Sequence, residues 1–214
     1  MEDYDFYRWK RWITAAALLT AVLVSVIFYV QERKEVKIQQ GIAEEVIRFH
    51  VLANSDTQGD QDLKMEVRDV VLEYLTVALE DCKTVGETRG RIIKELGKLE
   101  ELAVRYVQSR GYDYPVSAEL VTDEFPEKIY GDCTFPSGEY EALRIKIGEA
   151  QGHNWWCMVY PGLCFTEETG AYVSEENKTM LKHVLTEEEF EVLTKENRIK
   201  IRFRLLDLEL FDLF

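Results

Sequence analysis

Two sets of polar residues lie within and just after the apolar run at 46–53, with spacings that would bring their side chains together. Members of the first set alternate along an extended chain and so share one face of a strand, whereas members of the second recur every four residues along one stripe of a helix. The first set is His50, Asn54 and Asp56, and the second is Asp60, Lys64 and Arg68. This mixture of imidazole, amide, carboxylate and basic groups suits recognition of a polar partner. The alternative is that residues 54–56 only turn the chain while the charges are solvated.

A second candidate surface comes from residues 138–156, where charged and aromatic side chains accompany two apolar runs. Adjacent tryptophans on a strand point to opposite faces, so one can enter a core while the other is covered by a helix or meets a partner. Trp and Tyr are favoured as interface anchors, although both faces of the strand could equally be covered. The residues concerned are Glu139, Tyr140, Glu141, Arg144, Asn154, Trp155 and Trp156.

The chain has four cysteines but no C-x-x-C spacing, which gives no support to a thioredoxin-like or zinc-ribbon site. A disulfide between Cys157 and Cys164, or with Cys133, is chemically allowed if the domain lies outside the cytoplasm. Four cysteines permit three full pairings, so the connectivity stays open. The alternative is that Cys157, inside an apolar strand, is simply a small buried hydrophobe.

The motifs give little support to catalysis. A cysteine hydrolase would need Cys157 activated by a histidine, and His153 would lie about 13 Å away along an extended strand. The chain contains no G-x-S-x-G, H-E-x-x-H, P-loop or G-x-G-x-x-G motif and no recognised spacing of metal ligands. The sequence therefore predicts a protein that is not an enzyme and that has no catalytic residues, cofactor or metal. An extracytoplasmic hydrolase using Cys157 and a histidine is the alternative.

Helices that would position these residues are indicated by apolar residues at three- and four-residue steps. Residues 63–78 and 92–107 show this pattern, which predicts a long helical pair. Thr84 and Glu87 suggest a capping box before the second helix. A further capping box at 186–189 predicts another helix near the C-terminus.

Strands are predicted where apolar and polar residues alternate or where short apolar runs end in turn residues. Residues 141–147 and 155–160 would form a β-hairpin around the polar loop between them. The order of elements is roughly β-α-α-β-β-β-α-β, which predicts an α+β domain with helices on a mostly antiparallel sheet. The predicted strands are 46–53, 115–122, 141–147, 155–160 and 198–205.

The N-terminal 40 residues are typical of a membrane anchor. Residues 13–30 are uncharged and would form a helix about 27 Å long, close to the thickness of the hydrocarbon core. We expect a short tail at 1–12, a transmembrane signal-anchor at 13–30, a charged stalk at 31–40 and an extracytoplasmic α+β domain at 41–214. A cleaved signal peptide is the alternative, but the sequence YVQERKEV after the apolar run offers no A-x-A site. Basic residues flank both ends equally, so the outward orientation rests on the short tail and the long C-terminal domain.

Charge excludes one class of partner. The net charge is −14, and the first 35 residues carry five acidic and five basic side chains, so the whole excess belongs to residues 36–214. A domain this acidic is a poor binder of nucleic acid, because neutralising phosphates requires a basic face. It would also avoid anionic lipid head groups unless a tether held it near them.

Two long stretches resemble a known family. VIRFHVLANSDTQGDQDLKMEVRDVVL at 46–72 and FPSGEYEALRIKIGEAQGHNWWCMVYPGLCF at 135–165 are similar to stage II sporulation protein R of endospore-forming bacteria. Chain length and the N-terminal hydrophobic segment also agree, whereas residues 80–130 and 166–214 carry little of the resemblance. One departure is Gly162, where the family pattern usually reads Pro-Pro-Leu-Cys.

The resemblance implies an extracytoplasmic signalling protein, membrane-anchored or secreted, rather than a catalyst. Members are exported from the forespore into the space between forespore and mother cell, where they activate a membrane-embedded aspartic protease that cleaves pro-sigma-E. The implied partners are that protease and, through residues 13–30, the membrane. The two polar sets after residue 49 and the charged and aromatic residues at 139–156 would then together form the partner surface. A passive septal interaction protein without a signalling role is a further alternative.

Overall fold

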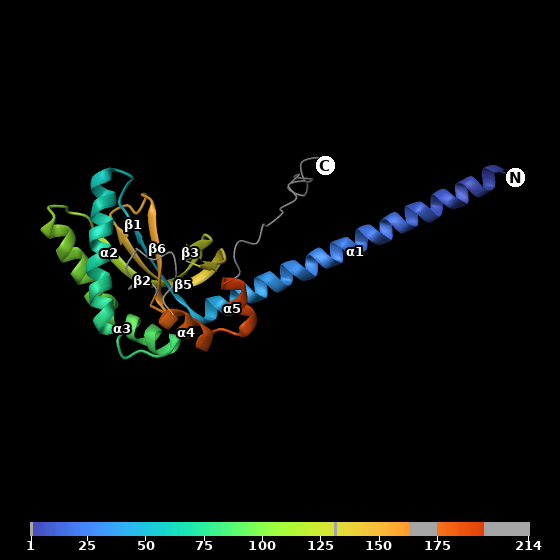
Figure 1. Cartoon of the computed structure of the whole chain (residues 1–214). Coiled ribbons are helices and arrows are strands. Elements are labelled where there is room, and N and C mark those ends of the chain that lie inside the picture. The colour runs from blue at the N-terminus through green and yellow to red at the C-terminus, as the bar shows by residue number, and fades with distance from the viewer. Residues whose placement is uncertain (1, 131, 163–174, 195–214) are drawn as a thin grey trace.

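The computed structural model describes residues 2–130, 132–162 and 175–194, and places a four-stranded sheet at the centre of the domain (Figure 1). The α+β class, with helices on a mostly antiparallel sheet, is confirmed, as is the long N-terminal apolar helix. The helices are α1 (Glu2–Glu45), α2 (Gln58–Ala78), α3 (Val85–Ser109), α4 (Glu175–Val184) and α5 (Glu187–Thr194). The strands are β1 (Ile47–Leu52), β2 (Val116–Phe125), β3 (Lys128–Tyr130), β4 (Cys133–Phe135), β5 (Gly138–Ile147) and β6 (Asn154–Tyr160).

The sheet has the order β2-β5-β1-β6, with β1 parallel to β5 and the other neighbours antiparallel. The expected hairpin between β5 and β6 is therefore wrong, because β1 lies between them. Five of the six β1 residues are buried, and a strand buried on both faces is best placed in the middle of a sheet. Strands β3 and β4 form a separate two-stranded sheet that the periodicity did not reveal.

Helices α2 and α3 form the predicted pair and pack on one face of the sheet (Figure 1). Leu63 and Val67 of α2 and Leu99 of α3 are fully or almost fully buried against the sheet in the larger of two apolar cores. The capping box before α3 is confirmed: Thr84 Oγ1 accepts the Glu87 N–H at 3.2 Å, and Glu87 accepts the Lys83 N–H at 2.7 Å. Thr84 thus satisfies one of the N–H groups that a helix start leaves without partners, and Glu87 binds the N–H of the residue before the cap.

The opposite face of the sheet is covered at the end of β1 nearest to α1. Ile42 of α1, Tyr140 of β5, Met158 of β6 and Leu193 of α5 share a second apolar core, together with residues of β2 and β4. Toward the other end of β1, the same face carries polar side chains that remain partly exposed, including Arg144 and Asp123. Among the residues that the structure describes, the cover thus stops short of the far end of the sheet.

Helix α1 continues through residues 31–40, so the charged segment after the apolar run is helical in the structure. Within α1, Trp9–Glu45 contains an 18-residue window of mean hydropathy 2.4, long and apolar enough to cross a membrane, and none of that window is buried. The predicted strand at 198–205 lies outside the described residues, as does Cys164.

Candidate functional site

The loops that follow β1 and β5 meet at one end of the sheet, because these two strands are parallel neighbours and their carboxyl ends lie side by side. Backbone hydrogen bonds join them: Gln151 N–H donates to Asn54 O at 3.2 Å, and Gly152 N–H donates to Ala53 O at 3.0 Å. We call residues 53–57 and 148–153 together the loop pair. Because β1 has six residues, the loop pair lies about 20 Å along the strand from the end of α1.

The loops approach so closely that glycine is required at their contact. A Cβ atom on Gly152 would lie 2.2 Å from the Ser55 carbonyl oxygen, a distance that no side chain tolerates. Gly148 has a φ of +60° and would place a Cβ atom 2.2 Å from Asn54 Oδ1. Both glycines therefore fix the geometry of the loop pair rather than merely loosening it.

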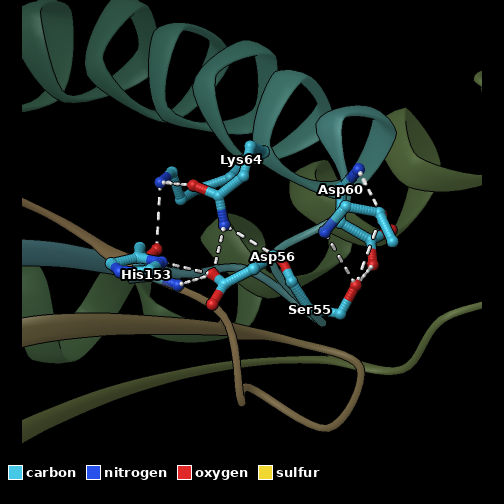
Figure 2. Close-up of polar contacts among 7 residues, drawn as sticks. Ser55, Asp56, Asp60, Lys64 and His153 are labelled. Carbon is cyan, nitrogen blue, oxygen red and sulfur yellow. Dashed lines mark hydrogen bonds and ion pairs between the residues drawn. The ribbon is translucent and has the colours of Figure 1, made fainter.

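Asp60, in the first turn of α2, is the buried acceptor beneath the loop pair (Figure 2). Its Oδ2 atom accepts Asn54 Nδ2–H at 2.9 Å and the Ser55 hydroxyl at 2.5 Å. Burial by itself would raise the pKa of Asp60, but the hydrogen bonds from Ser55 and Asn54 outweigh it and lower the pKa below its ordinary value. The carboxylate is thus held in the ionised form, where it also favours the helix N-terminus.

Lys64, one turn further along α2, ties the helix to the second loop (Figure 2). Its ammonium donates to His153 O at 2.9 Å and to Gln61 Oε1 at 2.5 Å. Burial lowers the pKa of Lys64, and nearby Asp56 opposes that shift. The side chain is only 5% exposed, so its charge serves mainly to hold the loop rather than to reach a partner.

His153 and Asp56 form the exposed part of the loop pair (Figure 2). Asp56 Oδ1 accepts the His153 backbone N–H at 2.6 Å and lies 2.5 Å from His153 Nδ1. The backbone hydrogen bond is the main reason that the pKa of Asp56 is lowered. The contact with Asp56 fixes the position of the His153 ring. The side chain is nevertheless 82% exposed, so most of the ring faces solvent.

A second polar group lies on the sheet face opposite α2 and α3, in the part that no described element covers, and we call this part of the sheet the open face. Arg144 donates to Asp123 Oδ2 at 2.8 Å and to Glu119 Oε2 at 2.7 Å. Lys146 lies 3.2 Å from the other oxygen of Glu119. Trp156, on the neighbouring strand β6, is half-buried at the edge of this group. The open face therefore combines a paired charge network with one aromatic ring.

His50 lies beneath the open face, stacked on Trp156 with ring centroids 4.8 Å apart. Its Nε2 atom is 3.0 Å from Asp123 Oδ2, but neither ring nitrogen has a well-aligned hydrogen bond to any described residue. Burial lowers the pKa of His50 to about 4; Asp123 opposes this shift, and the nearby positive charge of Arg144 adds to it. His50 is therefore neutral near pH 7.

Other residues expected at a partner surface are divided between the two faces. Trp155 faces α2, where the Arg68 guanidinium lies 4.9 Å from its ring centroid. Glu141 pairs with Arg89 of α3 at 2.8 Å. Asn154 is half-buried at the start of β6, and Glu139 is exposed on β5. Of these residues, Asn154 directly follows the loop pair, whereas Glu139 and Glu141 lie near the opposite end of β5.

Four residues expected at the partner surface are buried and are not available there: His50, Asp60, Lys64 and Tyr140. The physical reason is that their polar groups act inside the fold. Tyr140, for example, is 1% exposed and donates its hydroxyl to Pro136 O at 2.7 Å. Periodicity did not identify Glu119 and Asp123, although acidic residues at alternating positions of β2 indicate a polar face. Nor did it identify Arg48, the one charged residue inside the apolar run at 46–53.

The cysteines do not form a nucleophilic site around Cys157, which is disulfide-bonded and so carries no thiolate. Pairing through Cys133 is not found, because its thiol is free and buried, and burial raises its pKa to about 11. Cys82 is free and half-buried. Within the described residues, no group of three or more His, Cys, Asp or Glu side chains could hold a metal ion.

Fold and site thus define a small α+β domain carried on an N-terminal apolar helix, with loops cross-braced by buried polar residues. Residues 43–170 match the family described as Stage II sporulation protein R (spore_II_R). Stage II sporulation protein R of Bacillus subtilis (strain 168) is 34% identical over 154 residues, which cover 72% of this chain and 69% of that protein. The chain therefore belongs to the stage II sporulation protein R family and has a role in sporulation. No solved structure matches the chain.

Proposed function

We propose that this protein is an extracytoplasmic sporulation signal that activates a membrane-embedded aspartic protease, which then processes pro-sigma-E in the mother cell. On this proposal α1 crosses or is exported through the forespore membrane, and the domain acts in the space between forespore and mother cell. The proposal extends the family assignment to a partner and a compartment. The apolar window of α1 is compatible with either an anchored or a secreted protein.

The observation that carries the proposal is the convergence of the two family-resembling stretches. They contribute β1 with α2, and β5 with β6, and β1 lies directly between β5 and β6 in the sheet. Asp60 holds the first loop through Asn54 and Ser55, Lys64 holds the second through His153 O, and His153 is thereby presented at a fixed position in solvent. A preorganised exposed side chain of this kind loses little conformational entropy on binding, which favours recognition.

The hydrolase alternative with Cys157 loses its nucleophile to the disulfide bond. A passive tether remains distinguishable by experiment. We would co-express the full chain with the sporulation protease and pro-sigma-E in a non-sporulating bacterium and follow the size of the sigma precursor. We expect processing only when this chain is present and exported. An exported, folded chain that left the precursor uncut would contradict the signalling proposal.

A matched pair of variants tests the loop pair in the same assay. We expect His153→Ala to reduce the processing rate at least about 10-fold, as for an interface hot spot, with little loss of stability because its pair with Asp56 is solvent-exposed. The control is Arg105→Ala on α3, an exposed residue paired with Glu101 and distant in sequence from both loops. Equal processing by the two variants would remove His153 from the partner surface.

A further inference from the structure

An arginine without a counter-ion is buried in the second core. Arg48 of β1 is 0% exposed, and its Nε, Nη1 and Nη2 atoms have no hydrogen-bond partner among the described residues. The contrast with Arg144, which pairs with both Asp123 and Glu119, is sharp in so acidic a domain. A buried unpaired charge is expensive, so a fold that keeps one requires an explanation.

Aromatic rings surround the Arg48 guanidinium and account for part of its stabilisation. The Cζ atom lies 4.5 Å from the ring centroid of Phe125, 4.9 Å from that of Tyr140, and 5.8 Å from those of Tyr130 and Phe135. Ring faces attract a cation but do not replace the acceptors that the N–H groups had in water. Burial lowers the pKa of Arg48, yet a guanidinium starts so high that it stays protonated near neutral pH.

The rings of Phe125, Tyr130, Phe135 and Tyr140 form an aromatic box around Arg48, and Tyr130 adds a second unpaired polar group to it. Its hydroxyl oxygen is buried and has no hydrogen-bond partner among the described residues. Tyr130 ends β3, which among the described strands pairs with β4 alone, and each of these two strands has three residues. A hairpin this short is marginally stable by itself, so β3 and β4 are the part of the cover that is easiest to displace.

We propose that Arg48 and Tyr130 form a binding site for a single carboxylate, enclosed by the aromatic box. A planar carboxylate matches the fork of N–H donors of a guanidinium and leaves an oxygen for the Tyr130 hydroxyl. A monoanion also balances the one positive charge, whereas a phosphate dianion would leave excess negative charge in an apolar box. The carboxylate comes either from an Asp or Glu side chain of a protein partner or from a free monocarboxylate.

Acetate is the probe. The full chain in detergent micelles would be heated in sodium acetate or in sodium chloride of equal ionic strength, and the midpoint of thermal unfolding recorded. At an acetate concentration well above its dissociation constant, we expect the wild-type midpoint to rise by about 2–4 °C relative to chloride. This readout needs no signalling activity, so it succeeds or fails separately from the proposed function.

Variants show whether the shift belongs to this site. Arg48→Met should abolish the acetate shift, and Tyr130→Phe, which removes only the hydroxyl, should reduce it. Arg110→Met is the control, because that side chain is 52% exposed and paired with Glu66, and it should keep the full shift. If Arg48→Met does not fold, Tyr130→Phe decides. An unchanged shift in Tyr130→Phe, an equal shift in Arg48→Met, or no acetate-specific shift in the wild type would overturn the proposal.

The processing assay separates the two sources of the carboxylate. If it belongs to the protein partner, Arg48→Met loses processing as well as the acetate shift. If it is a free monocarboxylate unconnected with signalling, Arg48→Met loses the shift alone. Either result keeps the site, and the pattern of losses identifies what fills it.

Discussion

Lowering the pH from 6.5 to 4.5 should destabilise this domain through His50. The imidazole is 2% exposed, and burial, opposed by Asp123, lowers its pKa to about 4. In the unfolded chain a histidine titrates near its ordinary pKa of about 6.5. Between these values the unfolded state takes up a proton that the folded state does not, so stability falls as the pH is lowered. The whole pKa difference corresponds to roughly 3 kcal/mol, and most of it is lost by pH 4.5.

The measurement is urea unfolding of the full chain in micelles, followed by near-ultraviolet circular dichroism at several pH values from 7 to 4.5. His50→Gln removes the titrating group and should flatten the pH dependence over this window. His183→Gln, at an exposed position on α4, should leave the dependence as in the wild type. An unchanged slope in His50→Gln would refute the reasoning, as would a wild-type domain that gained stability while the pH fell.

Three further outcomes follow from the same contacts. Asp60→Ala should lower the free energy of unfolding by about 2–4 kcal/mol in urea melts, because it leaves Asn54 and Ser55 without their buried acceptor. The control Asp62→Ala, at an exposed position, should change it by less than about 0.5 kcal/mol. Equal values would contradict the role given to Asp60. Thr84→Ala should cost about 1 kcal/mol in the same melts through loss of the α3 cap, and no measurable loss would argue against the cap. Alkylation of the folded, unreduced chain at neutral pH should modify Cys82 and spare Cys157, as read by mass spectrometry of peptides; rapid labelling of Cys157 would revive the hydrolase alternative.

Sequence periodicity and local motifs predicted what depends on near neighbours in the chain. The helical pair, the cap at Thr84 and the long apolar helix at the N-terminus all rest on interactions within a few residues. The strands β1, β5 and β6 were likewise visible from their own alternation or apolar runs. Sequence resemblance to a family added the sporulation role, which no periodicity could supply.

The polar residues illustrate the limit of that reasoning. Their spacing correctly placed Asp60 and Lys64 on one helix, but it could not say whether they faced solvent. Lys64 is buried where the second loop, about 90 positions away, offers His153 O as an acceptor, and Asp60 is buried where it accepts hydrogen bonds from Asn54 and Ser55 of the first loop. A surface interpretation of these charges therefore needed the contact between two loops, and the spacing within one loop does not contain it.

What the sequence by itself determined is the type of each element, because alternation and helical steps record which face of an element is apolar. Only the tertiary structure decided that β1 separates β5 from β6, since periodicity does not specify which strand lies alongside. That one choice sets Arg48 among aromatic rings, brings His50 next to Asp123, and joins the loops that follow β1 and β5. Side-chain environments of this kind arise from contacts between distant segments, and so they appear only when the chain is folded.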